Sequence, residues 1–424
     1  MASKEDILNE IDANREEYIH LLQRFIQAAS PNPPGDTTKA SRVMIAFLSQ
    51  HDISADVIAP QPHMPNIVAH FDGERGPGHR VVFNGHIDTF PANEPEKWER
   101  DPYSGHNDGS AIHGLGAVDM KAGTAASIIA FTLLKKRAQH LKGSVALTAV
   151  SDEETGGQFG TKYLLERSDN PALWRGDCVI NGEPGGLQSV RFGEKGTLRL
   201  TFTVTTPGAN GAYKNLSRGA NIVAARLITK LQETVESISS DLPQDLKQHF
   251  ANPHTRKVVD EIMGPGAASV LLEPTLNIGV LNGGVKVNVI PSQCIFEADI
   301  RLPTGLTRDT MLARIRDEVL KDFPEASYAV QEAASNPANY LAHDHHPLTK
   351  CIADAAEGVT GRRPVPLVGM GGTDCKFYRY LGIPAFVFGV SPKGMGARGE
   401  AVLIDEFMAV VKTHTLAVWD YLSE

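Results

Sequence analysis

The stretch KAGTAASIIAFTLLKKRAQHLKGSVALTAVS, residues 121–151, decides the fold class of this chain. Its first part, Lys121–Arg137, is rich in small apolar residues and predicts a buried helix. The run at Ser144–Ser151 is short and apolar, as is the run at Arg80–Asn84 before the helix, and both are typical of buried parallel strands. Strand, helix and strand in this order indicate a βαβ unit, so we expect an α/β sheet with helices on both faces.

The same alternation continues outward from this stretch in both directions. The remaining helices are predicted at Ile7–Gln27, Thr38–His51, Gly160–Glu166, Pro347–Thr360 and Asp405–Leu422, and further strands at Asn66–Phe71 and Ala385–Gly389.

The pattern changes in the middle of the chain. Six elements are predicted there in the order strand, helix, strand, strand, helix, strand, at Thr197–Thr205, Ile222–Ile238, Thr275–Val280, Gln293–Leu302, Arg308–Asp322 and Ser327–Glu332. This is the split-βαβ, ferredoxin-like order. We therefore predict an α/β domain made of residues 1–194 and 336–424, interrupted by an inserted α+β domain of residues 195–335.

Composition excludes several classes of protein. The 424 residues are 42% hydrophobic and 21% charged, as in a soluble globular protein. The net charge of −9 argues against binding to nucleic acid or a membrane surface, which needs basic patches. We find no run of about 20 apolar residues and no signal peptide, so no membrane span is expected. Four widely spaced cysteines suit a reducing compartment, and we predict a cytoplasmic protein.

Four polar clusters follow strands of the first domain, where open α/β sheets bind ligands. They read NGHID at 84–88, GAVDMK at 116–121, SDEETG at 151–156 and NGEP at 181–184. Any one of them alone could be a turn or a helix cap. Together they supply one imidazole and several carboxylates, which are the ligands of Zn²⁺ or Co²⁺. Asp88, two residues after His86, would accept the second imidazole N–H and fix the tautomer.

The ordered segments GHIDTFP, GAVDMKAG, SDEETGG, GEP and GGTDCKF resemble a known superfamily of zinc exopeptidases and deacylases. Its members include aminoacylase, acetylornithine deacetylase, succinyl-diaminopimelate desuccinylase and carboxypeptidase G. The resemblance covers nearly the whole chain. It implies a zinc-exopeptidase-like catalytic domain, with a mixed sheet flanked by helices, and an inserted domain that acts as lid and dimer contact. It also implies an amidohydrolase or peptidase whose substrate is an N-acyl amino acid or a small peptide.

The resemblance implies a role for each of five residues, position by position. Asp119 would bridge two metal ions. His86 and Glu183 would complete one site, and Glu154 would serve the other. Glu153 would be the general base, which takes a proton from water and returns it to the leaving amine.

Further positions match substrate-binding residues of the superfamily. Asn288 in VNVIP and Arg301 in ADIRLP lie in the inserted domain, and Arg301 is implied to bind a carboxylate. A surface ion pair is the other interpretation of Arg301. Thr373 and Asp374 in GGTDCKF also match, but the usual arginine is Lys376 here, so a bidentate contact becomes a point charge.

Two histidines of the superfamily are missing. The last metal ligand normally lies in an Ala-His-Gly segment before the final helix, where this chain reads GARGE at 396–400 and has Arg398. A second Ala-His-Gly segment, implied to stabilise the oxyanion in the partner subunit's site, reads ANG at 209–211. Asn210 could donate only a neutral hydrogen bond there. By the same resemblance, Thr197–Thr205 and Ile222–Ile238 would place an edge strand and a helix at a homodimer contact.

Three functions remain open on these residues. The first is a hydrolase with one Zn²⁺ or Co²⁺ per chain, held by His86, Asp119 and Glu183. The second is a relative recruited to amide formation, cyclisation or elimination, in which Arg398 pairs with Glu154 or binds a substrate anion. The third is a non-catalytic binding homologue. The intact base and first half of the metal site favour the first two.

Overall fold

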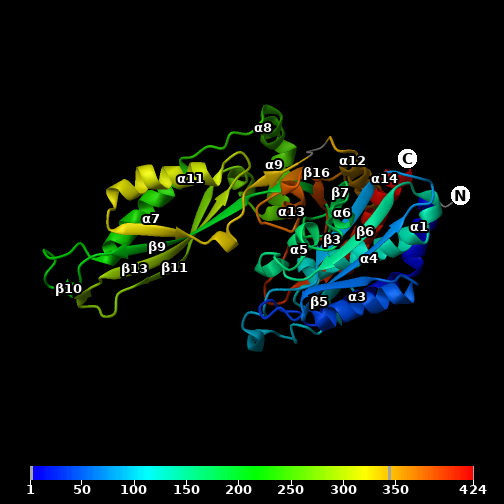
Figure 1. The fold of residues 1–424 in the computed structure, drawn as a ribbon, viewed down its shortest axis with the longest axis horizontal. Helices are drawn as coiled ribbons and strands as arrows, with labels where there is room; N and C mark the ends of the chain where they lie inside the picture. The colour runs from blue at the N-terminus through cyan, green and yellow to red at the C-terminus, as the bar shows by residue number, and fades with distance from the viewer. Residues whose placement is uncertain (1–2, 342–344, 424) are drawn as a thin grey trace.

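The computed structural model describes residues 3–341 and 345–423. Figure 1 shows two units: a compact one, which contains both ends of the chain, and an elongated one beside it. The compact unit is built on a nine-stranded sheet with the order β1-β2-β6-β3-β7-β17-β8-β15, and β16 pairs with β8. Its strands are β1 (Asp56–Gln61), β2 (Met64–Asp72), β3 (Arg80–His86), β6 (Ser144–Val150), β7 (Cys178–Asn181), β8 (Ser189–Glu194), β15 (Asn339–Tyr340), β16 (Val365–Gly369) and β17 (Ala385–Val387).

The sheet is mixed and covered on both faces, as predicted. β3 pairs in parallel with β6 and β7, whereas β1, β2 and β15 pair antiparallel to their neighbours. Along β3, Val81 and Phe83 lie in one hydrophobic core and Val82 lies in the other. Such alternation is what a strand buried on both faces requires.

Helices of this unit divide between the two faces. One core contains side chains of α1 (Lys4–Ala13), α2 (Arg15–Gln27), α3 (Thr38–Gln50), α4 (Ala122–Lys135), α12 (Pro347–Thr360) and α14 (Ile404–Ser423), and the other those of α5 (Thr161–Glu166), α6 (Pro171–Arg175) and α13 (Cys375–Tyr380). In the described part of the chain, Ala117–Lys135 has the length and hydropathy of a membrane span, and 94% of that window is buried. It is the core helix that the sequence predicted.

One predicted element is wrong in its extent. Ile7–Gln27 was expected as a single helix, but the chain breaks at Asn14 into α1 and α2. The Asn14 side chain donates to the Glu10 main-chain oxygen (2.8 Å) and so satisfies a carbonyl at the end of α1. Short polar side chains compete for backbone groups in this way, which ends a helix.

The elongated unit has the predicted split-βαβ order. Its elements are β9 (Gly196–Thr205), α7 (Ala220–Glu236), β11 (Thr275–Gly283), β13 (Gln293–Leu302), α11 (Arg308–Arg314) with two short helical turns to Asp322, and β14 (Ala326–Val330). They form an antiparallel sheet with the order β11-β13-β9-β14. A separate hydrophobic core, drawn from residues between Leu198 and Phe323, lies between this sheet and α7 and α11.

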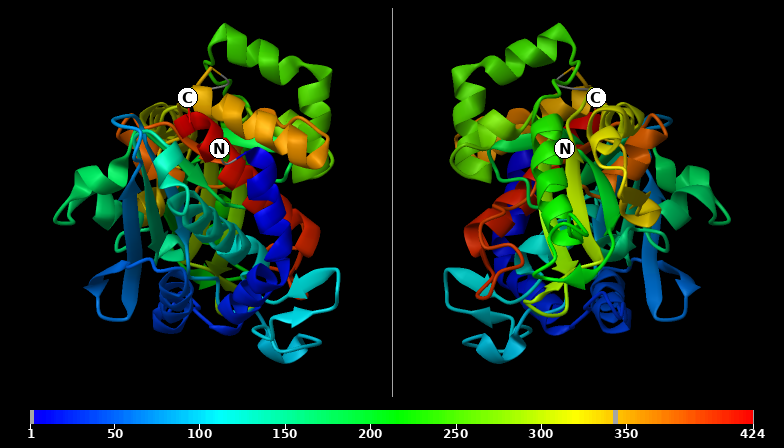
Figure 2. Two further views of the ribbon diagram at one scale, coloured as in Figure 1. Left: turned by 90° about the vertical axis from the view of Figure 1, so that its right-hand side faces the viewer. Right: turned by 90° about the vertical axis from the view of Figure 1, so that its left-hand side faces the viewer.

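A helical excursion between α7 and β11 escaped the sequence analysis. It consists of α8 (Gln244–Ala251), α9 (Pro253–Met263) and α10 (Ala267–Val270). Although these helices fall within residues 195–335, Phe250 and Val258 belong to the core of the compact unit. Figure 2 shows the green helices α8 and α9 beside the orange α12. The excursion therefore joins the two units by packing.

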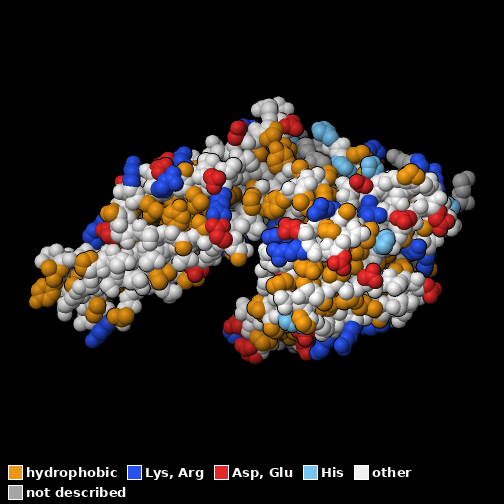
Figure 3. Space-filling view, viewed as in Figure 1, with side chains coloured by type: hydrophobic (Ala, Val, Ile, Leu, Met, Phe, Trp, Pro, Cys, Tyr) orange, Lys and Arg blue, Asp and Glu red, His pale blue; other side chains and the backbone are white. Residues whose placement is uncertain are grey.

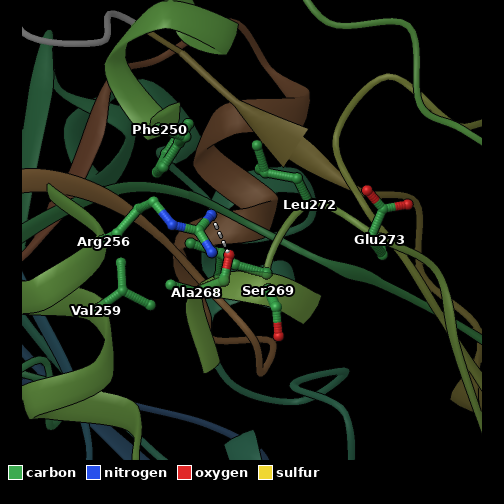
Figure 4. Close-up of a pocket in the computed structure, with 8 residues that line it drawn as sticks. Phe250, Arg256, Val259, Ala268, Ser269, Leu272 and Glu273 are labelled. Atoms are coloured by element: carbon green, nitrogen blue, oxygen red, sulfur yellow. Dashed lines mark hydrogen bonds between the residues drawn. The ribbon is translucent and has the colours of Figure 1, made fainter. Parts of the chain in front are cut away.

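The excursion is also fixed by polar contacts. His249 Nε2 lies 2.7 Å from the main-chain oxygen of Pro366 in β16. A hollow of about 110 Å³ lies beside α9, where Arg256 donates to the Ala268 carbonyl at 3.1 Å (Figure 4). Among the described residues, none of those that line it belongs to a group of His, Cys, Asp and Glu able to hold a metal ion.

Candidate metal centre

The polar clusters meet at one edge of the nine-stranded sheet. His86 ends β3, Glu153 and Glu154 lie in the helical turn directly after β6, and Glu183 follows β7. Because β3, β6 and β7 are parallel neighbours, their carboxyl ends bring these residues together. Asp119 joins them from the turn that leads into α4.

Two glycines allow this close approach. A Cβ atom on Gly123 of α4 would lie 1.9 Å from the Gly182 main-chain oxygen, and one on Gly182 would lie 2.5 Å from the Gly123 Cα. Only glycine fits at both positions, so the start of α4 can touch the turn after β7. This contact sets Asp119 and Glu183 on the same side of His86.

His86 is the centre of the cluster. Its Nε2 lies 3.2 Å from Asp119 Oδ1 and 3.5 Å from Glu183 Oε1. Its Nδ1 lies 2.9 Å from the Asp88 main-chain oxygen, and with Nδ1 as the donor the Nε2 lone pair faces the carboxylates. Burial lowers the pKa of His86, but the carboxylates of Asp119, Asp88 and Glu183 outweigh burial and hold this pKa well above its usual range. The imidazole thus needs a cation, a proton or a metal ion, between Nε2 and the carboxylates.

Asp88 holds the cluster differently from the prediction. The hydrogen bond to His86 comes from its main-chain carbonyl, while its carboxylate lies 3.4 Å from Nδ1. That carboxylate accepts from Asn32 Nδ2 (2.8 Å) and from the main-chain N–H groups of Glu153 (3.3 Å) and Glu154 (3.2 Å). Burial raises the pKa of Asp88, yet His86 and Asn32 hold it below its usual range. Asp88 therefore fixes the turn that carries the two glutamates.

The donor atoms fall into two compact groups among the described residues. One is His86, Glu153 and Glu183, and the other is His86, Asp119 and Glu154. Within each group the donor atoms lie within 4.8 Å of one another. This grouping differs from the partition that the resemblance implies, because Glu153 stands with Glu183 and both groups share the single imidazole.

The carboxylates fit a divalent cation. Burial raises the pKa of Glu153 to about 8, of Glu154 to about 10 and of Glu183 to about 7, and neighbouring carboxylates add to each rise. Glu154 Oε1 is buried and has no hydrogen-bond partner in the described part of the chain. Buried carboxylates this close together need a positive charge between them. One imidazole with several carboxylates is the donor chemistry of Zn²⁺ or Co²⁺.

Lys376 lies against the expected general base. Its Nζ is 3.6 Å from Glu153 Oε1 and donates to the Thr373 main-chain oxygen (3.1 Å). Asp374, beside it in sequence, accepts a hydrogen bond from Thr161 Oγ1 (2.7 Å) and is buried. Burial lowers the pKa of Lys376, but Glu153 and Asp374 outweigh it and raise that pKa. Lys376 thus neutralises carboxylates of the cluster.

An open cleft of about 700 Å³ lies between the two units (Figure 3). Seven of the predicted site residues line it: Asp119, Glu153, Glu154, Glu183, Arg301, Thr373 and Lys376. Arg301 stands on β13 and pairs with Asp299 at 2.9 Å, and Thr373 Oγ1 donates to Glu194 at 2.8 Å. The sequence analysis missed the cations Arg191, Lys195 and Arg199 on the same walls.

Two predicted residues lie far from this cleft. Asn210 in β10 (Ala209–Asn210) is paired with β12 (Val289–Ile290), next to Asn288. Figure 1 shows β10 at the end of the elongated unit farthest from β3 and β6. Neither Asn210 nor Asn288 can serve the cluster of its own chain.

Arg398 does not join the carboxylates. Its side chain is half exposed, and its guanidinium lies 3.6 Å from Glu94. The expected pairing with Glu154 is absent from the ion pairs of the described residues. Gly396 and Gly399, on either side of Arg398, have φ of +67° and +83°, a backbone conformation that favours glycine. Arg398 instead lines a separate hollow of about 380 Å³.

Glu400, two residues further on, turns inward instead. Its carboxylate accepts from the main-chain N–H groups of Val118 (2.7 Å) and Asp119 (3.3 Å), and from that of Gly396 (3.1 Å). It is 1% exposed, and burial raises its pKa to about 7. Glu400 thus positions the Asp119 backbone. In the sequence, Glu400 is seen only as the residue before the apolar strand β18 (Ala401–Leu403). That position does not reveal its contact with the Asp119 backbone.

Comparison with known proteins gives consistent matches. The profile described as peptidase family M20/M25/M40 matches residues 82–420. A succinyl-diaminopimelate desuccinylase of Cereibacter sphaeroides is 26% identical over 85% of this chain and 88% of its own length. A crystal structure of the M20 metallo-carboxypeptidase Sso-CP2 from Sulfolobus solfataricus superposes with a TM-score of 0.79 at 18% identity, covering 96% of this chain and 99% of that one. Human carnosine dipeptidase 1 gives a TM-score of 0.73 at 16% identity over 99% of both chains.

Proposed function

Because the chain belongs to peptidase family M20/M25/M40, we propose that it hydrolyses the amide bond of an N-acyl amino acid or a small peptide with one bound divalent ion. Family membership makes the chain a metal-dependent hydrolase of amide or peptide bonds. The substrate and the number of ions are the parts that we propose.

The proposal of one ion per chain rests on the single imidazole of the cluster. Both compact donor groups contain His86, and in the described part of the chain no second histidine reaches either group. We assign the ion, Zn²⁺ or Co²⁺, to His86 with Asp119 and Glu183, because both carboxylates lie within 3.5 Å of Nε2. When bound, such an ion polarises an amide carbonyl and acidifies water.

The residues around the ion would transfer the proton and hold the base in place. Glu153 takes the proton of the attacking water on its carboxylate and returns it to the leaving amine nitrogen. Lys376, 3.6 Å away, stabilises the charged form of Glu153. The Asp88 carboxylate accepts from the main-chain N–H of Glu153 (3.3 Å) and so fixes the turn that carries this base. The alternatives, amide formation, cyclisation and elimination, required Arg398 to pair with Glu154 or to bind a substrate anion. Arg398 lies beside Glu94 instead, so no observation supports these alternatives.

The one-ion proposal predicts the metal content. We expect about one tightly bound divalent ion per chain, because catalytic zinc sites use three protein ligands and keep a fourth position open. His86→Ala should abolish binding, since it removes the nitrogen donor of both groups. His113→Ala is the matched control, because His113 pairs with Asp108 outside the cluster and should leave the content unchanged. Elemental analysis after dialysis measures this, and two equivalents in the unaltered protein would contradict the proposal.

We also propose that two copies associate through the elongated unit. Exposed hydrophobic side chains gather at its far end, where Figure 3 shows an orange patch: Tyr213, Leu216, Leu281, Val285 and Val287. The prediction that Thr197–Thr205 is an edge strand is wrong, because β9 lies between β13 and β14. The edge beside this patch is β11, which offers unpaired backbone groups to a second copy.

A double substitution tests this association. Leu281→Asp with Val287→Asp should convert a dimer to a monomer, because buried unpaired charges oppose contact. Sedimentation velocity at micromolar concentration measures the change. Val57→Asp, an exposed hydrophobic position on β1 of the compact unit, is the control and should not alter the mass. If the unaltered protein sediments as a monomer, the dimer and any role of Asn210 in a neighbouring site are both lost.

The proposed compartment is the cytoplasm. Cys178, Cys294 and Cys375 are free, buried thiols in the part of the chain that the structure describes. Free, mostly buried thiols suit a reducing environment.

A further inference from the structure

Lys121 is a buried lysine that takes no part in the proposed reaction. It is 0% exposed, and its Nζ donates to the main-chain oxygens of Phe25 and Ala28, both at 2.9 Å. The same nitrogen lies 5.0 Å from the centre of the Phe25 ring. A polar side chain is costly to bury unless its donors are paired, so these contacts compensate the burial of Lys121.

The two carbonyl groups that accept from Lys121 lie at the carboxyl end of α2. The last carbonyls of a helix have no partner within the helix and carry the negative end of its dipole. Ala29, whose N–H would continue the helical ladder to the Phe25 oxygen, donates to the Gln27 oxygen instead (3.0 Å). Lys121 therefore supplies hydrogen-bond donors at this end of α2, and it joins the helix to the segment that carries Lys121.

That segment, residues 119–124, holds two of the proposed metal ligands. Asp119 belongs to it and has non-helical φ and ψ of −111° and 100°. His86 is bound to it twice, because its main-chain N–H donates to Met120 Sδ (3.2 Å) and its carbonyl accepts from Thr124 Oγ1 (2.7 Å). A shift of this segment would therefore displace both ligands.

The turn with Asp119 is restrained on both sides. Before it, the Glu400 carboxylate accepts from the main-chain N–H groups of Val118 (2.7 Å) and Asp119 (3.3 Å). After it, Lys121 binds the end of α2. Asp119 lies between the two restraints, and its Oδ1 stands 3.2 Å from His86 Nε2.

We propose that Lys121 is a positioning residue for the bound ion: by joining residues 119–124 to the carboxyl end of α2, it keeps Asp119 and His86 at the spacing that one divalent ion requires. This inference rests on the proposed assignment of the ion to these two residues and Glu183. Lys121 does not bind the ion itself, because a lysine ammonium offers donors only, and these face α2.

Binding of Co²⁺ tests this role. Lys121→Met keeps much of the length of the side chain and removes its donors. We expect Co²⁺ to bind roughly 10- to 100-fold more weakly, as is typical when a residue that orients a metal ligand is lost. Competition with a chelator measures the affinity. The visible absorption spectrum of bound Co²⁺ should also change shape, which a loss of stability alone would not cause in the molecules that stay folded.

Lys195→Met is the matched control. Lys195 is 3% exposed, and its Nζ also donates to two main-chain oxygens, those of Val270 and Glu273, both at 2.6 Å. These bonds tie Lys195 to the end of α10 and the residues after it, away from segment 119–124. The control should lose stability as Lys121→Met does, but it should keep the affinity and the spectrum of bound Co²⁺.

The outcomes separate this inference from the proposed metal site. If Lys121→Met binds Co²⁺ with unchanged affinity and spectrum, or if Lys195→Met weakens binding equally, the inference is refuted while the one-ion proposal stands. Lys121→Gln, which keeps a shorter donor, replaces Lys121→Met if that protein does not fold, and it should also weaken binding. If neither variant folds, Lys121 acts in folding and the inference is refuted. If the unaltered protein binds no Co²⁺, the proposed metal site fails, and the inference fails with it.

Discussion

Glu153→Gln should lower kcat by at least about 100-fold while the bound metal stays constant. The amide keeps the shape of the side chain and removes the atom that accepts a proton from water. Its main-chain N–H still donates to Asp88, so the turn keeps its position. Turnover of the best N-acetyl amino acid and elemental analysis on the same preparation measure the two quantities together.

Two further variants serve as controls for the Glu153→Gln result. Glu166→Gln, on the exposed side of α5, should leave both turnover and metal content unchanged. Glu154→Gln removes a buried carboxylate that is neither the base nor one of the three proposed ligands, so we expect it to lower turnover less than Glu153→Gln does. Turnover of Glu153→Gln within a few-fold of the unaltered enzyme would move the base to another residue.

Arg379→Met should lower the free energy of unfolding by about 3–5 kcal/mol. Arg379 and Glu194 form an ion pair at 3.2 Å, and their side chains are 0% and 3% exposed. The guanidinium also donates to the Ala385 main-chain oxygen (2.7 Å) and to Asn339 Oδ1 (3.0 Å). Methionine fills much of the space but leaves the buried Glu194 without its cationic partner and removes the guanidinium donors to the Ala385 carbonyl.

Thermal unfolding of the metal-free protein measures the loss, which should appear as a drop of roughly 3–6 °C in the midpoint for a chain of this length. The matched control is Arg363→Met. Arg363 also contacts two carboxylates, Asp354 and Glu357 at 2.8 Å, but its side chain is 48% exposed. Water screens that pair, so we expect a change of less than about 1 kcal/mol. Equal effects of the two substitutions would refute burial as the cause.

Much of the fold followed from local patterns. The apolar runs at β3 and β6 and the small-residue helix α4 were each predicted, because a strand or helix buried on all sides shows it in its own residues. The split-βαβ order of the elongated unit was predicted in the same way. Helices α8–α10 were missed, since their short amphipathic faces pack on a distant part of the chain.

The candidate site was predicted in part. Glu153, Glu154 and Glu183 lie with His86 because they follow parallel neighbouring strands, and strand order along a sheet edge can be inferred from βαβ connections. The Nδ1 contact of His86 with the Asp88 carbonyl could not be inferred, because it depends on the backbone direction after the strand.

By itself the sequence determined most of the buried strands and helices and which residues supply the imidazole and the carboxylates, because periodicity and residue type are local properties. Only the tertiary structure decided where the loop side chains point. Arg398 lies half exposed beside Glu94, whereas the Glu400 carboxylate accepts from the Asp119 backbone. The buried ion pair of Arg379 with Glu194 was likewise visible only in the folded chain. Such pairing is settled by contacts between segments far apart in the chain, and no local pattern of residues records it.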